Sequence, residues 1–190
     1  RNGHDLTVRD LDRKAAEPFL ARGAKWADSP KAMMAACDIV ITCLPSPQAC
    51  AAVMEGEDGL IEAVGPGKIW AEMSTTDAGE IKRLAAKVGE KGGKAIECPV
   101  SGGCHRAATG NISIFAGCDR ETFETMLPFL KTLGRRILHT GPIGSASILK
   151  VMTNYLATAN LLTLCEAMVT MKAAGLDLAT TWEAIVISSG

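Results

Sequence analysis

The chain has 190 residues, of which 47% are hydrophobic and 22% are charged, and its formal net charge at pH 7 is −1. This length suffices for one substantial domain, or for one domain and part of another, and the composition is typical of a globular protein. The near-neutral charge excludes the strongly basic character expected of a protein that binds nucleic acid or an anionic membrane surface.

In chain order, short apolar and β-branched runs alternate with helical patterns. Strands are predicted at 5–10, 38–45, 68–74, 94–100, 111–117 and 135–141, and helices at 12–22, 30–36, 77–91 and 119–133. This alternation predicts the α/β class, with a doubly wound, mostly parallel sheet that helices cover on both faces. The strands are nearly continuous apolar runs, as strands buried on both faces are.

After residue 141 the pattern is purely helical. A long apolar helix is predicted at 145–174, and Asp177 begins a shorter one. We therefore expect a first domain over 1–142 and the incomplete beginning of an all-helical domain over 143–190. Asparagine, threonine and glutamate residues interrupt the long helix, which favours a buried or interface helix over a membrane span. Because the chain starts without Met, in a turn before a strand, we expect truncation at both ends.

The cysteine and histidine residues give no sign of a disulfide framework or of a metal site. The seven cysteines are an odd number without C-x-x-C spacing, and the three histidines lie far apart in the sequence. Free thiols of this kind are typical of a reducing environment. We therefore expect the cytoplasm or another reducing compartment, and no bound metal.

The ends of the first three predicted strands carry candidate cofactor ligands, because a doubly wound sheet binds ligands at the carboxyl ends of its strands. Asp10 ends the first predicted strand. In a dinucleotide-binding sheet, an acid at the end of the second strand accepts hydrogen bonds from ribose hydroxyls and repels a 2′-phosphate. The other candidates are Leu44-Pro45 and Ser74-Thr75. An ordinary strand-end aspartate, loop prolines and helix-capping hydroxyls are the alternative interpretations.

The next predicted strand is followed by Ser101-Gly102-Gly103. Two consecutive glycines expose backbone N–H groups without a Cβ to block a small anion, so this turn is a candidate site for a carboxylate. The alternative is a flexible turn without a ligand.

A single lysine stands out in the long apolar helix. Between residues 146 and 171 the formal charges are Lys150 and Glu166, and Asn154 follows Lys150 by one helical turn. A lysine on a helix is usually solvated, but this helix has little polar surface for it. A partly buried lysine lowers its pKa readily, which suits general acid/base chemistry on a hydroxyl or carbonyl group.

Taken together, these motifs resemble one family along the whole chain. The motifs are Asp10, Leu44-Pro45, Ser74-Thr75, Pro99-Val100-Ser101-Gly102-Gly103, and Gly141-x-x-Gly144 followed by Lys150-x-x-x-Asn154. In this order they resemble the 3-hydroxyisobutyrate dehydrogenase family, which is related to 6-phosphogluconate dehydrogenase. The chain departs from the family pattern in having no G-x-G-x-x-G loop.

The resemblance implies a Rossmann-type NAD(P)-binding domain, here without its first βα unit, followed by a long interdomain helix. It implies a dehydrogenase acting on CH–OH donors, which transfers a hydride between the nicotinamide and a small β-hydroxy acid or its semialdehyde. It implies Lys150 as the catalytic residue, with Ser101, Gly102, Gly103 and Asn154 at the substrate and Asp10, Leu44, Pro45, Ser74 and Thr75 at the cofactor.

The cofactor, the substrate and the assembly stay partly open. Asp10 favours NAD, with NADP as the alternative, because NADP-preferring relatives usually carry an arginine beside this position, where this chain has Leu11. Glyoxylate or succinic semialdehyde, tartronate semialdehyde and 6-phosphogluconate are alternative substrates, and a non-catalytic dinucleotide-binding module is an alternative function. The exposed apolar face expected on the long helix predicts a homo-oligomer, either a dimer or a tetramer.

Overall fold

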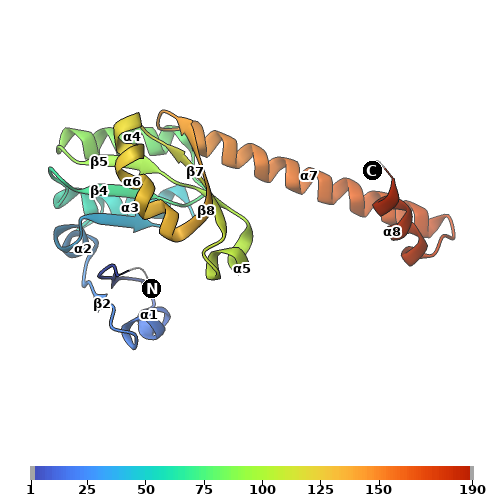
Figure 1. The fold of residues 1–190 in the computed structure, drawn as a ribbon, viewed down its shortest axis with the longest axis horizontal. Helices are drawn as coiled ribbons and strands as arrows, with labels where there is room; N and C mark the ends of the chain where they lie inside the picture. The colour runs from blue at the N-terminus through green and yellow to red at the C-terminus, as the bar shows by residue number, and fades with distance from the viewer. Residues whose placement is uncertain (1–2, 189–190) are drawn as a thin grey trace. The chain divides into compact units, whose positions relative to one another are not determined.

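A computed structural model describes residues 3–188 of the chain (Figure 1). Its contacts divide the chain into two compact units, which meet between Lys150 and Val151, inside helix α7 (Ser145–Ala173). The first unit contains every strand of the described residues. The domain boundary expected from the sequence, at 142/143, stays a prediction.

The strands are β1 (Thr7–Val8), β2 (Lys25–Trp26), β3 (Ile39–Thr42), β4 (Ile69–Glu72), β5 (Lys94–Glu97), β6 (Val100–Ser101), β7 (Ile112–Gly117) and β8 (Gly134–Gly141). The helices, besides α7, are α1 (Arg13–Leu20), α2 (Pro30–Ala36), α3 (Pro47–Glu55), the 3-10 turn η1 (Leu60–Glu62), α4 (Ala78–Glu90), α5 (Gly103–Ala108), α6 (Arg120–Leu133) and α8 (Leu178–Ile187). All the predicted strands and helices are present, with small differences at their ends.

The main sheet has six strands. Its order is β3-β4-β5-β7-β6, and β8 pairs with β7. The pairs β3–β4, β4–β5 and β7–β8 are parallel, whereas β7 runs antiparallel to β5 and β6. The short strands β1 and β2 form a separate parallel pair. The predicted α/β fold with a mostly parallel sheet is confirmed.

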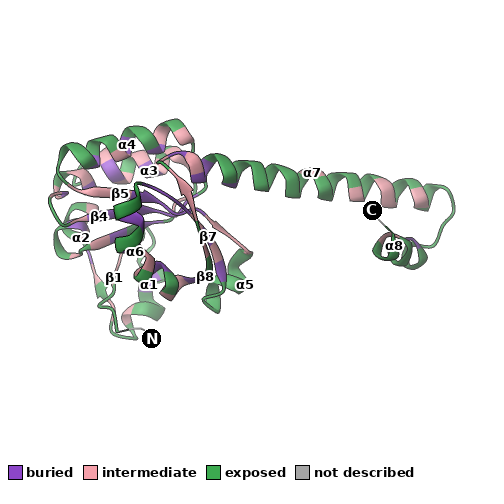
Figure 2. Ribbon diagram, turned by 45° about the horizontal axis from the view of Figure 1, so that its top comes forward, coloured by how far each residue is buried: buried purple, intermediate pink, exposed green. Residues whose placement is uncertain are grey.

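Alternate residues of the strands face opposite sides of the sheet, so the sheet has a core on each face. On β4, Ile69 and Ala71 pack in one apolar cluster with residues of α6. Trp70, between them in sequence, packs in the other cluster with residues of α2, α3 and α4. Figure 2 shows the buried residues concentrated in the strands between these helices. Helices therefore cover both faces, as the sequence predicted.

Several local features differ from the sequence prediction, and the short elements β2 and η1 were not predicted. The predicted strand 94–100 is two strands, because Pro99 has no N–H to continue the ladder. Helix α3 was not predicted, because its prolines were interpreted as ending the strand, yet Ser46 caps it by accepting the Ala49 N–H at 3.1 Å, and Pro47 occupies its first turn. The six-residue helix α5 was also missed, because its start is rich in glycine.

Two kinds of feature are absent from the described residues. Between residues 3 and 188 there is no helix that is both long and apolar enough to span a membrane. The same residues contain no group of three or more His, Cys, Asp or Glu side chains arranged to hold a metal ion.

Candidate functional site

A cavity of about 490 Å³ lies where β1 and β3 end. Its lining includes Asp10, Leu44 and Pro45, three residues that the sequence analysis assigned to a cofactor. Much of the remaining wall is apolar and comes from side chains of α2, β3, α3 and η1. They include Met33, Val40, Ile41, Val53 and Leu60. An apolar pocket with one carboxylate at its rim suits the adenosine end of a dinucleotide.

The arginines next to Asp10 are engaged elsewhere. Arg9 donates from its guanidinium to the carbonyl oxygens of Ala27 (3.2 Å) and Asp28. The Arg13 guanidinium lies 4.9 Å from the centre of the Trp26 ring. The Asp10 carboxylate accepts one N–H bond, from Asp12 at 3.0 Å, and keeps further acceptor capacity for a ligand.

Ser74 and Leu44 lie together, although 30 residues separate them in sequence. The Leu44 N–H donates to Ser74 Oγ at 2.7 Å, and the Ser74 side chain is buried. Thr75 is exposed beside them, and the buried Thr76 hydroxyl has no hydrogen-bond partner within the described part of the chain. An orphaned polar group of this kind at a strand end indicates a site for a ligand or a water molecule. The sequence analysis missed Thr76.

The Ser101-Gly102-Gly103 turn has a backbone that only glycine adopts easily. The φ angles are +131° at Gly102 and +76° at Gly103. A Cβ atom built at Gly102 would also lie 2.8 Å from Cδ of Arg106. The backbone conformation of this turn therefore favours glycine at both positions, whether or not a ligand binds there.

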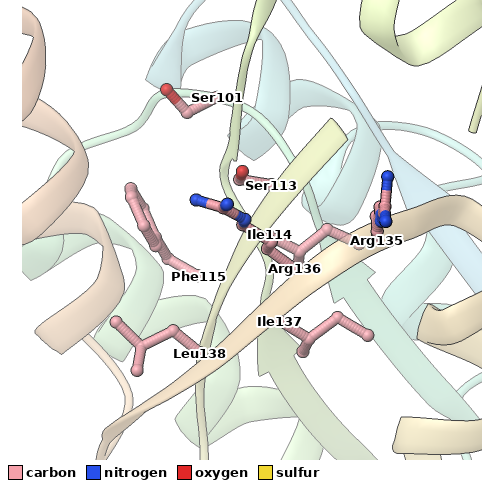
Figure 3. Close-up of a pocket in the computed structure, with 8 residues that line it drawn as sticks. All are labelled: Ser101, Ser113, Ile114, Phe115, Arg135, Arg136, Ile137 and Leu138. Atoms are coloured by element: carbon pink, nitrogen blue, oxygen red, sulfur yellow. The ribbon is translucent and has the colours of Figure 1, made fainter. Parts of the chain in front are cut away.

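Ser101 also lines a shallow hollow of about 560 Å³ on the face of β6, β7 and β8 (Figure 3). Ser101 pairs with Ser113 on β7, and Ser113 pairs with Arg136 on β8, so the three residues form one row across the sheet. Phe115 and Leu138 line the hollow beside this row. The sequence analysis missed Arg136, because sequence alone does not give the strand register that places it in the same row as Ser101.

Lys150 is buried, with 8% of its surface exposed. It is the only buried lysine or arginine among residues 3–188, and burial lowers the pKa of its ammonium group. The buried residues of α7 are Ala146, Ser147 and Lys150, so this helix is covered only along its first turns. Asn154 follows one turn later, in the second unit, and is exposed.

A buried carboxylate binds the backbone at Ser74, one of the candidate cofactor residues. Glu72, at the end of β4, is fully buried and accepts the Ser74 N–H at 2.6 Å. Its other oxygen accepts the Thr42 hydroxyl and the Cys50 thiol. Burial, and then the nearby Glu72 carboxylate, raises the pKa of the Cys50 thiol, which makes it a structural donor and a poor nucleophile.

The family model described as the NAD binding domain of 6-phosphogluconate dehydrogenase matches residues 1–141. The chain belongs to this family. It is 33% identical over 188 residues to the NAD-dependent L-serine dehydrogenase of Pseudomonas aeruginosa, a match that covers 99% of the chain and 63% of that protein. It is 32% identical to the 2-(hydroxymethyl)glutarate dehydrogenase of Eubacterium barkeri, over all of the chain and 63% of that protein.

A solved structure agrees with these matches. The structure of Mycobacterium tuberculosis 3-hydroxyisobutyrate dehydrogenase with L-serine superposes with a TM-score of 0.87 at 26% identity, over 99% of the chain and 64% of that protein. The chain thus spans slightly less than two thirds of the length of these relatives. The resemblance to the 3-hydroxyisobutyrate dehydrogenase family is confirmed, and so is the Rossmann-type NAD(P)-binding domain.

Proposed function

We propose that the protein is a dehydrogenase that transfers a hydride between NAD and a small β-hydroxy acid or its semialdehyde, with Lys150 as the general acid/base. The burial of Lys150, the one cation enclosed in the described residues, carries this proposal. A lowered pKa makes a neutral amine accessible nearer to neutral pH. NAD, when bound, supplies the nicotinamide carbon that accepts the hydride.

In the oxidative direction, the neutral Lys150 amine takes the proton of the substrate hydroxyl. At the same time a hydride leaves the carbon that bears this hydroxyl and passes to the nicotinamide. In the reductive direction, the Lys150 ammonium returns that proton to the carbonyl oxygen. We assign Asn154 to the same oxygen, because it follows on the same helix by one turn. The substrate carboxylate is assigned to the Ser101 hydroxyl and the backbone N–H groups of Gly102 and Gly103, which have no side chain to block it.

The names of the relatives support this substrate class. L-Serine, 2-(hydroxymethyl)glutarate and 3-hydroxyisobutyrate each carry a hydroxymethyl group on the carbon next to a carboxylate. One site for the carboxylate and one acid/base for the hydroxyl would serve all three. Glyoxylate or succinic semialdehyde, tartronate semialdehyde and 6-phosphogluconate remain alternative substrates.

On the cofactor side, we propose that Asp10, Leu44, Pro45, Ser74 and Thr75 hold NAD, with NADP as the alternative. The cavity lined by Asp10, Leu44 and Pro45 supports this assignment. Arg9 lines the same cavity, but its guanidinium is bonded to the carbonyl oxygens of Ala27 and Asp28, and the Arg13 guanidinium lies over the Trp26 ring, which supports NAD over NADP.

The compartment and the assembly are also proposals. All seven cysteines are free thiols, which supports the cytoplasm or another reducing compartment. Exposed apolar side chains on α7 support a homo-oligomer.

The test is the variant Lys150→Met in the full-length protein, which keeps the bulk of the side chain and removes the proton-transfer group. We expect turnover to fall by about 10²-fold or more, the usual contribution of general acid/base catalysis, with NAD affinity unchanged within a few-fold. Lys172→Met, which removes an exposed lysine from the last turn of the same helix, is the matched control.

NAD affinity that falls as far as turnover would make Lys150 a structural residue and contradict the proposal. The same measurement separates the alternative function, because a non-catalytic module would show NAD binding without turnover in the unmodified protein. Lys150→Arg adds a second check. It keeps the charge but cannot deprotonate, so we expect it to be as inactive as Lys150→Met.

A further inference from the structure

Glu97 connects the sheet to the start of α7. It is the last residue of β5 and is fully buried. One of its carboxylate oxygens accepts the N–H groups of Gly144 (2.6 Å) and Ala146 (2.8 Å). The other accepts the N–H of Ser147 at 3.1 Å and the Ser147 hydroxyl. A single carboxylate, 47 to 50 residues away in sequence, therefore binds three of the N–H groups at the start of the helix.

These hydrogen bonds provide partners for N–H groups that every helix leaves unpaired at its start. The first N–H groups of a helix have no partner within it, and a negative charge near them is favourable. Most helices in this chain satisfy these groups with a local Ser or Asp cap, such as Ser46 of α3 or Asp119 of α6. At α7 the partner comes from the sheet, so the cap also fixes where the helix begins relative to β5.

Two glycines accompany this contact. Gly117 on β7 pairs with Glu97, and a Cβ atom there would lie 2.2 Å from a Glu97 carboxylate oxygen. Gly144, whose N–H is bound by the carboxylate, has φ +96°, a conformation that other residues rarely adopt, and a Cβ atom there would lie 2.3 Å from Cε of Lys82. Gly117 therefore leaves room for the carboxylate itself, and Gly144 allows the backbone shape that the carboxylate binds.

Lys150 lies one turn beyond this contact. Ser147 and Lys150 are three residues apart, and residues at this spacing share a face of a helix. Both are buried, together with Ala146, and they are the only buried residues of α7 within the described residues. The orientation of the first turn therefore decides where Lys150 points.

We propose that Glu97 is a positioning residue, which clamps the first turn of α7 so that Lys150 is held in place for proton transfer. This role rests on the proposed function of Lys150. Glu97 touches neither substrate nor cofactor in this assignment and acts only through the helix.

A neighbouring residue provides a matched comparison. Glu72 pairs with Glu97 across β4 and β5 and is equally buried. Its hydrogen bonds go to Thr42, Cys50 and Ser74, on the cofactor side, rather than to α7. Glu72→Gln and Glu97→Gln thus remove the same charge from adjacent positions and disturb different parts of the site.

The experiment compares Glu97→Gln with Glu72→Gln in the full-length protein, with Val88→Ala, a change in the core of α4, as a control for general destabilisation. An amide has one acceptor oxygen and places N–H donors against the donors of α7. For Glu97→Gln we expect kcat to fall by about 10- to 100-fold, as misplaced catalytic groups do, with the KM for NAD unchanged. For Glu72→Gln we expect the reverse, a raised KM for NAD with a smaller effect on kcat.

Hydrogen exchange gives a readout that does not depend on catalysis. In Glu97→Gln, the amides of Gly144, Ala146 and Ser147 should exchange faster by about tenfold or more, the factor implied by losing a hydrogen bond to a charged group. Exchange at the wild-type rate would overturn the clamp, whatever Lys150 does. Faster exchange with unchanged kcat would overturn the positioning role. Full turnover in Lys150→Met would instead overturn the proposed function, so the two failures are distinguishable.

Discussion

At the scale of single residues, the candidate site divides into residues that the sequence revealed and residues that it hid. Asp10, Leu44 and Pro45 follow strands, and the rule that strand ends meet predicted their shared cavity. Glu97 and Arg136 were missed, because their significance depends on partners that are distant in sequence or on strand register. The roles assigned to Lys150, Asn154 and the Ser101-Gly102-Gly103 turn stay predictions.

Asp10 allows a test of cofactor choice. We expect Asp10→Ser to raise the KM for NAD by about tenfold, because a hydrogen bond to a charged group contributes about 1.5–3 kcal/mol. The KM for NADP should fall or stay constant, since the repulsion of a 2′-phosphate is removed. Steady-state kinetics with both cofactors measure this. Asp5→Ser, at an exposed aspartate of the same segment, should change neither value. An equal rise in both KM values would show that Asp10 does not discriminate.

At the scale of secondary-structure elements, the apolar periodicity predicted the main strands and helices because these elements alternate regularly. It failed at short elements whose stability comes from tertiary contacts, such as strand β2 and helix α5. For α3 the signal was present. Ser46-Pro47 is the same N-terminal pattern as Ser29-Pro30 of α2, which was interpreted correctly. The antiparallel pairing of β7 with β5 had no signal in the sequence.

The contact between α3 and α4 should be sensitive to acid. Glu55, the last residue of α3, accepts hydrogen bonds from Arg83 and Lys87 of α4, which lower the pKa of its carboxyl group to about 2. A carboxyl group whose pKa is lower in the folded state than in the unfolded state stabilises the fold at every pH above its unfolded-state pKa. This stabilisation is lost as the pH falls toward the folded-state value.

We therefore expect Glu55→Gln to reduce the loss of stability between pH 4.5 and pH 2, the interval between the ordinary and the folded-state pKa. Urea unfolding of both proteins across this interval measures the difference. The effect should be small, because Arg83 is 42% exposed and solvent screens the pair. Glu57→Gln, at an exposed neighbour, should follow the pH dependence of the unmodified chain. Parallel curves for Glu55→Gln and the unmodified chain would show that the ion pairs add nothing.

At the scale of the whole molecule, the apolar surface is concentrated on the helices of the second unit. Tyr155, Leu162 and Val169 of α7 follow one another at intervals of seven residues and are 66%, 59% and 67% exposed. Residues at this interval share a face of a helix, and such a stripe is typical of helices that pack against a partner helix. The composition of the sequence had predicted this apolar helix, but the periodic exposure needed the structure.

We expect the 190-residue chain to self-associate through this stripe as its concentration rises. Leu162→Glu and Val169→Glu should shift sedimentation-equilibrium profiles toward the 19.9 kDa monomer, because each buries a charge without a partner at the contact. Leu6→Glu, at an exposed leucine of the first unit, is the matched control and should leave the profile unchanged. A monomer at all concentrations would exclude the stripe as a self-association surface.

The strand order of the main sheet also has a consequence for how fast the chain folds. In each of the parallel pairs β3–β4 and β4–β5, a crossover segment that contains a helix joins the two strands. Each of these pairs must therefore close a long loop before its contacts form. Sheets dominated by such non-local pairing fold more slowly than helical proteins of similar stability. The contacts within α4 and α6 are local, whereas the contacts of Glu97 with Gly144, Ala146 and Ser147 span 47 to 50 residues and close a longer loop. We therefore expect the contact of Glu97 with α7 to form later in folding than the helices α4 and α6.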